Sequence, residues 1–263
     1  MTRLVRFTFD PSLPPTTPDP SPSVLHGVLE DGVVRAADGR EWPRPSVRLL
    51  PPCSPTKIVC VGRNYVEHAR ELGNEVPAEP LIFFKPPSAL TGDGWPILYP
   101  ALTSNLHYEG ELGVVIGARA RHVPASEARR YILGYTCVND VTARDLQKKD
   151  GQWARAKGFD TFCPVGPYVV PAEEVEFGSL RVRTLVDGAV RQDAPVTDMI
   201  FPVEEIIAFV TAFLTLEPGD LIATGTPPGV GPVQPGSEVV VDIAGLGSLR
   251  NPVVSAAHDL ETL

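Results

Sequence analysis

The sequence predicts an α+β fold in which β-strands predominate. Short apolar runs separated by glycines recur along most of the chain, whereas helical patterns are few. Strands and helices do not alternate regularly, which argues against a doubly wound parallel sheet. The chain has 263 residues, 43% hydrophobic and 21% charged, so it is an ordinary globular protein, long enough for one large domain with a small companion.

The first 52 residues are expected to form the small domain, made of β-strands. The stretch HGVLEDGVVRAADGREW, residues 26–42, has short β-prone pieces with two turn signals, Asp31-Gly32 and Asp38-Gly39. The proline-rich segment LPPTTPDPSPS, residues 13–23, cannot form a regular element, because proline removes backbone donors, and is predicted to be a loop.

Residues 53–263 are expected to form the large domain. Its predicted strands are KIVCVG, LIFF, LGVVIG, YILGYTCVND, LRVRTLVDGAVRQ, DLIATG and EVVVDIAG. The pair Asp187-Gly188 inside the fifth of these is a strong hairpin signal. Helices are predicted at residues 65–72, 126–131 and 204–214.

Composition excludes several classes of partner. A net charge of -9, with no local cluster of Lys and Arg, disfavours nucleic acid and anionic membranes. No apolar run reaches membrane-spanning length and the N-terminus lacks signal-peptide features, so a cytoplasmic location is expected. The four cysteines form no C-x-x-C pair, which suggests neither a zinc site nor disulfides.

Two glutamates, Glu109 and Glu111, open the apolar run HYEGELGVV at residues 107–115. Because side chains alternate across a strand, both glutamates project from one face. An unpaired buried carboxylate is costly, so water or a cation must compensate the pair. The plainer interpretation is an edge strand with both glutamates in solvent. The functional interpretation is a site for a hard cation.

A third carboxylate, Asp140, ends the apolar run GYTCVND. Ends of strands present side chains to clefts from a rigid sheet, so the three carboxylates can converge. A set of carboxylates without Cys or an obligatory His suits Mg²⁺ or Mn²⁺ rather than zinc. The alternative for Asp140 is an aspartate that caps a turn.

The segment GRNYVEHARELG, residues 62–73, has the pattern of a short capped helix. Asn64 is expected to cap it in a capping-box pattern with Glu67, and Gly73 to end it. His68 and Glu71 then share one face, where the carboxylate can fix the imidazole tautomer and stabilise its protonated form. Such a pair can act as a general base toward water. The alternative is a solvated pair on a surface helix.

Two loops carry further candidate groups. In AKGFDTFCPVGP, residues 156–167, Lys157 could polarise a substrate carbonyl, although most lysines are simply solvated. In ATGTPPGVG, residues 223–231, the glycines permit close backbone approach, and the amides could hold a carboxylate. This loop lacks the Lys-Ser/Thr pair of a phosphate-binding loop and the glycine spacing of a dinucleotide-binding fold. The alternative interpretation is an ordinary tight turn without a ligand.

Taken together, the motifs resemble the fumarylacetoacetate hydrolase family. GRNYVEHAREL, IFFKPPSAL, HYEGELGVVIG, NDVTARDLQ, KGFDTFCPVGP, MIF and GDLIATGTPPGVGPV occur in the family's order, over about residues 56–255. The resemblance is greater to the small acylpyruvase, oxaloacetate decarboxylase and 2-hydroxyhepta-2,4-diene-1,7-dioate isomerase branch than to the long fumarylacetoacetate hydrolase. It implies a mixed β-sandwich roll around a metal, usually in a homodimer.

The resemblance also implies roles for individual residues. These are metal ligation by Glu109, Glu111 and Asp140, catalysis by His68 and Glu71 on a lid and by Lys157, and substrate binding by Gln147, Gly225 and Thr226. The chain departs from the family at Gly158, where many relatives have serine, which places the floor of the pocket and the substrate identity in doubt.

The activity implied is that of a Mg²⁺- or Mn²⁺-dependent enzyme whose substrate is a small 2-oxo acid. Its substrate would be a 2,4-dioxo acid or a 2-oxo or 2-hydroxydienoic dicarboxylic acid, which reacts through a metal-bound enolate. Hydrolysis of a C–C bond, decarboxylation and isomerisation all stay open. The alternative function is a catalytically silent, metal-stabilised binding protein.

Overall fold

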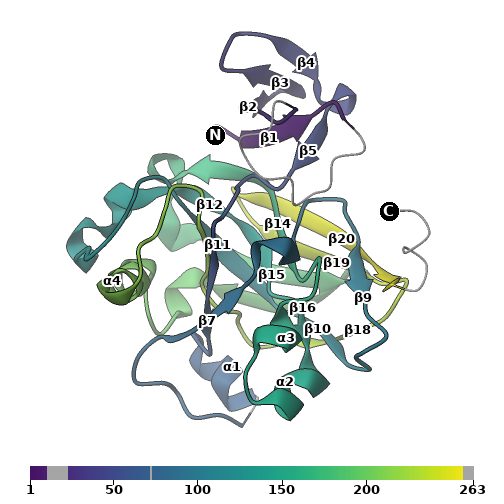
Figure 1. Ribbon diagram of the computed structural model, residues 1–263, viewed down its shortest axis with the longest axis vertical. Helices are drawn as coiled ribbons and strands as arrows, with labels where there is room; N and C mark the ends of the chain where they lie inside the picture. The colour runs from purple at the N-terminus through teal and green to yellow at the C-terminus, as the bar shows by residue number, and fades with distance from the viewer. Residues whose placement is uncertain (11–22, 72, 257–263) are drawn as a thin grey trace.

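The computed structural model describes residues 1–10, 23–71 and 73–256, and its strands predominate as the sequence predicts (Figure 1). In that part of the chain the largest sheet has twelve strands. They are β1 Leu4–Thr8, β2 Leu25–Glu30, β3 Val33–Ala36, β4 Glu41–Pro43, β5 Arg48–Leu50, β6 Ile58–Gly62, β7 Leu81–Lys85, β8 Leu90–Thr91, β11 Gly110–Ile116, β12 Ile132–Asn139, β14 Cys163–Pro171 and β17 Leu221–Ala223. The order is β4-β3-β2-β1-β14-β12-β11-β17-β6-β7, with β5 on β1 and β8 on β14.

Strands β1 to β5 form the unit at the top of Figure 1. They enclose a small core of their own, which includes Val5, Phe7, Val34 and Leu49. Strand β1 also pairs with β14 of the main body, opposite Val169, so the sheet is continuous between the two units. The division into residues 1–52 and 53–263 stays a prediction, and most of the predicted loop at 13–23 lies outside the described residues.

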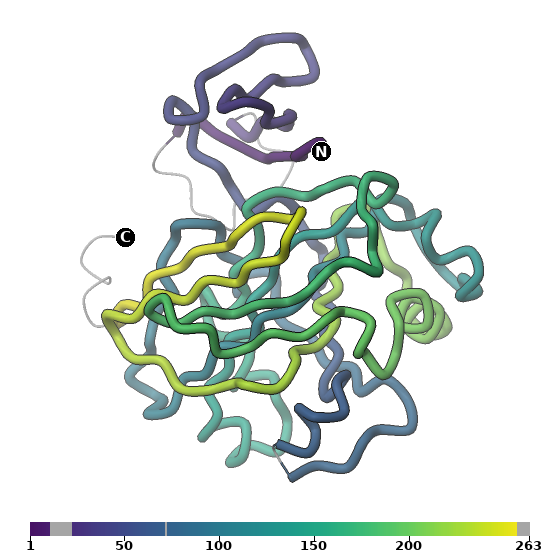
Figure 2. Tube along the Cα trace, turned by 180° about the vertical axis from the view of Figure 1, so that it is seen from behind, coloured from purple at the N-terminus to yellow at the C-terminus, as the bar shows by residue number. Residues whose placement is uncertain are grey.

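The second sheet has the order β16-β15-β19-β20-β9 and faces the viewer in Figure 2. Its strands are β9 Ile97–Tyr99, β15 Arg181–Val186, β16 Ala189–Pro195, β19 Glu238–Ile243 and β20 Gly247–Ser255. The main core lies between this sheet and the large one, where Leu112 and Val114 of β11 join one buried cluster with Val182 and Val241. A sheet of three short strands, β10 Leu106–Tyr108, β13 Thr142–Ala143 and β18 Gly231–Val233, lies beside the site described below. The layers make the predicted mixed β-sandwich.

The Asp-Gly turn signals are confirmed. Asp187 and Gly188 have φ values of 51° and 79°, and Val186 pairs with Ala189 across the turn between β15 and β16. Positive φ at both central residues suits the right-handed twist of a hairpin, which explains the glycine. Asp31-Gly32 makes the same kind of turn between β2 and β3.

The α-helices are few: α1 Val66–Glu71, α2 Arg144–Asp150, α3 Ala154–Lys157 and α4 Val203–Phe213. The short 3₁₀ turns are Arg44–Ser46, Pro87–Ala89, Ala125–Tyr131, Ala172–Glu174, Phe177–Ser179 and Val196–Asp198. The helices predicted at 65–72 and 204–214 are present within a residue or two, whereas the one predicted at 126–131 is a 3₁₀ helix. In the described residues no helix combines the length and apolar character needed to cross a membrane.

The predicted cap of α1 is wrong in one respect. Asn64 does not use its side chain to cap the helix, because that amide bonds to other segments of the chain. Its Nδ2 donates to the carbonyl oxygens of Phe201 and Thr224, and its Oδ1 accepts from the Phe201 N–H. Gly73 does end the helix, with a φ of 68°, and its N–H donates to the Arg70 carbonyl oxygen.

Candidate active site and metal centre

The three carboxylates singled out in the sequence converge in the structure. Glu109 and Glu111 lie at the start of β11, Asp140 follows β12, and the pairing of Gly110 with Asn139 brings the two strands together. One ligand oxygen from each carboxylate lies within 4.8 Å of the others. Glu109, Glu111 and Asp140 are 4%, 2% and 1% exposed, so the interpretation as solvent-facing glutamates on an edge strand is wrong.

Two cations compensate Glu109. Lys157 Nζ donates to Glu109 Oε2 at 2.9 Å, and Arg144 pairs with Glu109 Oε1. Burial alone would raise the pKa of Glu109, but these cations outweigh it and hold the pKa well below its usual value. Glu109 is therefore ionised throughout the physiological pH range.

Asp140 lies between two lysines. Lys157 Nζ donates to Asp140 Oδ2 at 2.6 Å. Lys85 Nζ lies 2.7 Å from Asp140 Oδ1 and forms an ion pair with it, but the angles do not suit a hydrogen bond. Lys85 also donates to the carbonyl oxygens of Val141, Lys157 and Phe162. This ammonium group thus ties the end of β7 to the segment that follows β12 and to the loop after α3.

Glu111 has no such compensation. It accepts a hydrogen bond from the Gly225 N–H at 2.8 Å, and among the described residues it forms no ion pair with Lys or Arg. Burial and the nearby charges of Asp140 and Glu109 raise the pKa of Glu111 well above its usual value. A cation bound between the carboxylates would remove this penalty, and the all-oxygen donors fit a hard divalent ion. The residues present therefore fit Mg²⁺ or Mn²⁺.

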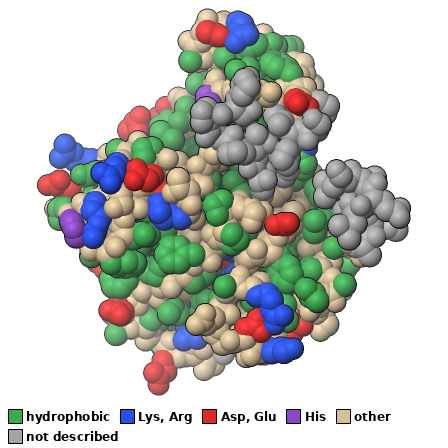
Figure 3. Space-filling view, viewed as in Figure 1, with side chains coloured by type: hydrophobic (Ala, Val, Ile, Leu, Met, Phe, Trp, Pro, Cys, Tyr) green, Lys and Arg blue, Asp and Glu red, His purple; other side chains and the backbone are tan. Residues whose placement is uncertain are grey.

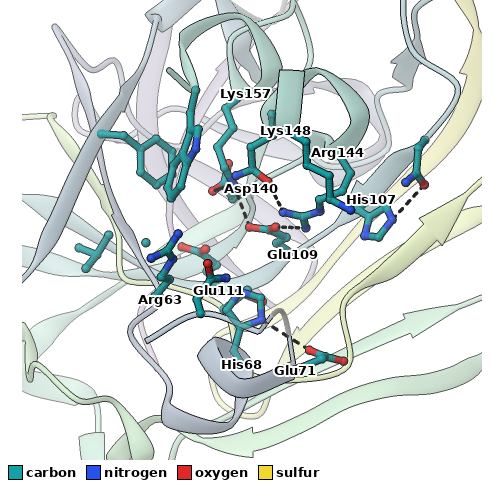
Figure 4. A pocket seen from close by; sticks show the side chains of 18 residues that line it. Arg63, His68, Glu71, His107, Glu109, Glu111, Asp140, Arg144, Lys148 and Lys157 are labelled. Carbon is teal, nitrogen blue, oxygen red and sulfur yellow. Dashed lines mark hydrogen bonds and ion pairs between the residues drawn. The ribbon is translucent and has the colours of Figure 1, made fainter. Parts of the chain in front are cut away.

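The predicted His68–Glu71 pair forms beside this cluster (Figure 4). His68 Nδ1 lies 3.6 Å from Glu71 Oε2, too far for a hydrogen bond, and has no other partner. The Glu71 carboxylate in turn accepts the Gly229 N–H at 3.1 Å. Burial lowers the pKa of His68, although Glu109 and Glu71 oppose the shift, so the imidazole is neutral at pH 7 and can accept a proton.

Lys157 lies beside the three carboxylates, at what is called here the metal end of the cavity, and its N–H groups are already hydrogen-bonded. Its ammonium group bonds to Glu109, Asp140 and Thr142 Oγ1, which uses all three N–H groups. A substrate oxygen can gain a hydrogen bond from Lys157 only if one of these acceptors is released. The role predicted for Lys157 therefore depends on rearrangement of these bonds.

Two of the three predicted substrate-binding residues line the same cavity, which has a volume of about 470 Å³, whereas Gly225 does not. Gln147 and Thr226 line it. Gln147 Oε1 accepts from Arg144, and Thr226 Oγ1 donates to the Gly110 carbonyl. Gly225 has a φ of 102°, and a Cβ there would lie 2.7 Å from that of Asn64, so close backbone approach requires glycine. Its N–H is already donated to Glu111, and contact of these residues with substrate stays a prediction.

Gly158 lies outside the cavity lining. A Cβ at this position would come within 2.4 Å of the Ala154 carbonyl oxygen and 3.1 Å of the Pro86 ring. The glycine that replaces the serine of many relatives therefore affects the packing of the backbone next to Lys157 and not the surface of the cavity.

Sequence reasoning missed several residues of the site. Lys85, Arg144, Arg63, Phe83, His107 and Trp153 belong to the cation network or line the cavity. A lysine directly after the apolar run LIFF was a usable signal, because a cation that continues an apolar run can be buried and then needs a carboxylate partner. Burial lowers the pKa of His107 to about 4, so this second histidine is neutral as well.

Comparison with known proteins identifies the family. The family model described as fumarylacetoacetate hydrolase C-terminal matches residues 57–254. Protein Rv2993c of Mycobacterium tuberculosis is 51% identical over 82% of this chain and 82% of its own. The human mitochondrial oxaloacetate tautomerase is 46% identical over 73% of this chain and 89% of its own. A mitochondrial oxaloacetate decarboxylase of Dictyostelium discoideum is 44% identical over 72% and 89%.

Solved structures extend the similarity to the whole fold. The 2-hydroxyhepta-2,4-diene-1,7-dioate isomerase from Mycobacterium marinum has a TM-score of 0.85 and 44% identity, covering 97% of this chain and 99% of that one. A fumarylpyruvate hydrolase from Pseudomonas aeruginosa, in complex with Mn²⁺ and pyruvate, has a TM-score of 0.73 and 33% identity, covering 86% and 98%. With the match to the family model, these relationships establish that the chain is an enzyme of the fumarylacetoacetate hydrolase family.

Proposed function

We propose that this enzyme binds Mg²⁺ or Mn²⁺ at Glu109, Glu111 and Asp140 and acts on small 2-oxo acids. The observation that carries the proposal is the buried convergence of three carboxylates of which one, Glu111, has no cationic partner in the described structure. A relative in complex with Mn²⁺ and pyruvate supports both the metal class and the 2-oxo acid class.

When bound, the ion would supply a Lewis acid that polarises the 2-oxo group and stabilises the enolate formed from it. The other steps belong to side chains of this chain. Neutral His68 would accept a proton from water or from substrate carbon, and Glu71 would stabilise the charge that then develops on the ring. Lys157 would donate to an oxygen that becomes negative, after it releases a carboxylate.

Three types of reaction fit this site: hydrolysis of a C–C bond, decarboxylation, and isomerisation or tautomerisation. The relatives are named for all of these, and each reaction passes through an enolate of a 2-oxo acid, formed by loss of an acyl group, of carbon dioxide or of a proton. Steady-state assays should therefore compare acetylpyruvate, oxaloacetate and 2-hydroxyhepta-2,4-diene-1,7-dioate, each with Mg²⁺, with Mn²⁺ and after dialysis against EDTA. Turnover that needs the metal supports the proposal. Full turnover by the metal-free enzyme would overturn it.

The alternative raised by the sequence is a catalytically silent, metal-stabilised binding protein, which the enzymes among the relatives argue against. It also predicts that Mg²⁺ raises the melting temperature, but with no turnover of any of the three substrates. The neutral buried histidine next to the carboxylates favours an enzyme, because a purely structural metal site has no need of a proton acceptor.

Three further expectations belong to this proposal. A homodimer is expected from the resemblance, and light scattering at micromolar concentration tests it, with a monomer mass as the contrary result. A cytoplasmic location is also proposed, although the human and Dictyostelium relatives are named mitochondrial. No binding of nucleic acid is expected, and on the face in Figure 3 the Lys and Arg side chains are interspersed with acidic ones.

A further inference from the structure

The cavity contains a cation that the proposed function does not use. Arg63 directly follows β6, is half-buried, and lines the same cavity as the three carboxylates. Figure 4 shows its side chain extending into the cavity. Among the described residues it forms no ion pair with Asp or Glu, whereas Arg144 is paired with Glu109. A guanidinium in a cavity without a carboxylate partner is suited to bind an anionic group of a ligand.

The backbone at Arg63 is held in an unusual conformation. Its φ is 57°, in the left-handed region that non-glycine residues rarely adopt. The next residue, Asn64, fixes this conformation through its bonds to Phe201 and Thr224. Non-glycine residues in this region cluster at functional sites, where the surrounding structure holds them in place. The fold therefore sets the direction in which the Arg63 side chain leaves the backbone.

An aromatic wall, formed by Phe83 and Trp153, lies beside both Arg63 and Lys157. The Phe83 and Trp153 rings meet edge to face with centroids 5.1 Å apart. Lys157 Nζ lies 4.9 Å from the Phe83 centroid and 5.9 Å from the Trp153 centroid, and the Arg63 guanidinium lies 6.0 Å from the Trp153 centroid. Trp153 also packs on Gly62, where a Cβ would lie 2.9 Å from the indole. The wall therefore offers an apolar surface for a carbon chain beside both cations.

We propose that Arg63 binds a second carboxylate at the far end of the substrate, so that the preferred substrates are 2-oxo dicarboxylic acids. The inference rests on the proposed function, in which the 2-oxo acid end lies at the metal. The carbon chain then lies along Phe83 and Trp153, and the distal carboxylate accepts two parallel N–H bonds from the guanidinium. Arg63 thereby determines specificity and takes no part in proton transfer.

Lys148 provides a matched control. It lines the same cavity and, among the described residues, also lacks an ion-pair partner, but its side chain is exposed to solvent. A solvated ammonium group on a flexible side chain contributes little to binding. Loss of charge at Lys148 therefore changes the overall electrostatics of the cavity mouth without removing the proposed contact.

The experiment measures binding of stable analogues by calorimetry to the full-length, Mg²⁺-loaded enzyme. 2-Oxohexanoate is compared with 2-oxohexanedioate, and 2-oxoheptanoate with 2-oxoheptanedioate, so that each pair differs only in the terminal carboxylate. The wild type should bind at least one diacid about 10- to 100-fold more tightly than its monoacid, as expected for a hydrogen-bonded charge pair. Arg63→Gln should reduce this preference to within about threefold and leave monoacid affinity unchanged, since only the charge pair is lost. Arg63→Lys should retain part of the preference, and Lys148→Gln nearly all of it.

Equal affinity of the wild type for monoacid and diacid in both pairs would overturn the inference and leave the proposed function standing. A preference that survives in Arg63→Gln, or is lost in Lys148→Gln, would overturn it as well. Absence of binding of all four acids would overturn the proposed function itself. If Arg63→Gln does not fold, the wild-type preference and its reduction in Arg63→Lys decide the question.

Discussion

The metal end and the lid end of the cavity are built in different ways. At the metal end, side chains from strand ends and adjoining segments form a buried cluster of three carboxylates, of which Glu109 and Asp140 pair with Lys85, Arg144 and Lys157. At the lid end, His68 and Glu71 sit on the six-residue helix α1, and the Glu71 side chain is 36% exposed and anchored to the Gly229 amide. His68 is as buried as Glu109, so the two ends differ in the exposure of Glu71 and in the absence of a strong ion pair on His68. Damage at the two ends should therefore have different consequences.

The largest effect is expected from Glu111→Gln. This substitution removes the carboxylate that lacks a cationic partner, so Mg²⁺ affinity should fall by more than about 100-fold, and turnover of every substrate should fall with it. Calorimetric titration with Mg²⁺ and assays at fixed metal concentration measure both losses. Glu67→Gln on the exposed face of α1 is the control and should change neither. Normal turnover of Glu111→Gln at the wild-type metal concentration would show that the metal end is misassigned.

The substitution His68→Ala should affect proton transfer without affecting metal binding, and so distinguish the functions of the two ends. Loss of the proton acceptor should slow hydrolysis of acetylpyruvate by a factor on the order of 10² to 10⁴. Decarboxylation of oxaloacetate should suffer much less, because it needs no activated water. Mg²⁺ binding should stay nearly intact, since His68 does not belong to the carboxylate cluster. If acetylpyruvate hydrolysis proceeds at the wild-type rate, or if metal binding is abolished, the role given to the lid is wrong.

Lys85→Met tests whether the metal end also supports the fold. The substitution leaves the buried Asp140 with one cation fewer and three carbonyl oxygens without their donor. Breaking such a buried pair costs about 3–5 kcal/mol of unfolding free energy. Urea unfolding measures the loss, and Lys148→Met at the exposed cavity mouth is the control, which should stay within about 0.5 kcal/mol of wild type. A similarly small change for Lys85→Met would mean that the network contributes little to stability.

The smallest effects should appear in the pH dependence of the melting temperature without metal. The pKa of His68 is lowered in the folded state, so its contribution to stability is lost as pH falls below about 6.5. The pKa of Glu111 is raised, so the folded protein holds this proton more tightly, and stability falls as pH rises above about 4.3. His68→Ala should flatten the acid side of the profile and Glu111→Gln the alkaline side. Scans in EDTA between pH 5 and 8 test this, and the same slopes in both variants and wild type would contradict it.

Some parts of the fold were readable from local sequence and others were not. The turns at Asp31-Gly32 and Asp187-Gly188 were predicted because their conformation depends on two adjacent residues. Strand β14 and helix α2 were missed. The first is interrupted by prolines and glycine in CPVGPYVVP, and the second, RDLQKKD, has too few apolar residues for a helical stripe. Both elements are stabilised by tertiary contacts rather than by their own pattern.

The sequence by itself determined that Glu109 and Glu111 share one face, since alternation along a strand is a property of the backbone. With the order of motifs, it also indicated the family and the convergence of Asp140 on this pair. Only the tertiary structure decided which carboxylate is compensated. Arg144 and Lys157 reach Glu109 from 35 and 48 residues away, whereas Glu111 receives a single backbone amide from 114 residues away. Charges separated by so many residues interact only once the chain is folded, because Coulomb energy depends on their distance and on the water excluded around them. No local sequence pattern predicts that energy.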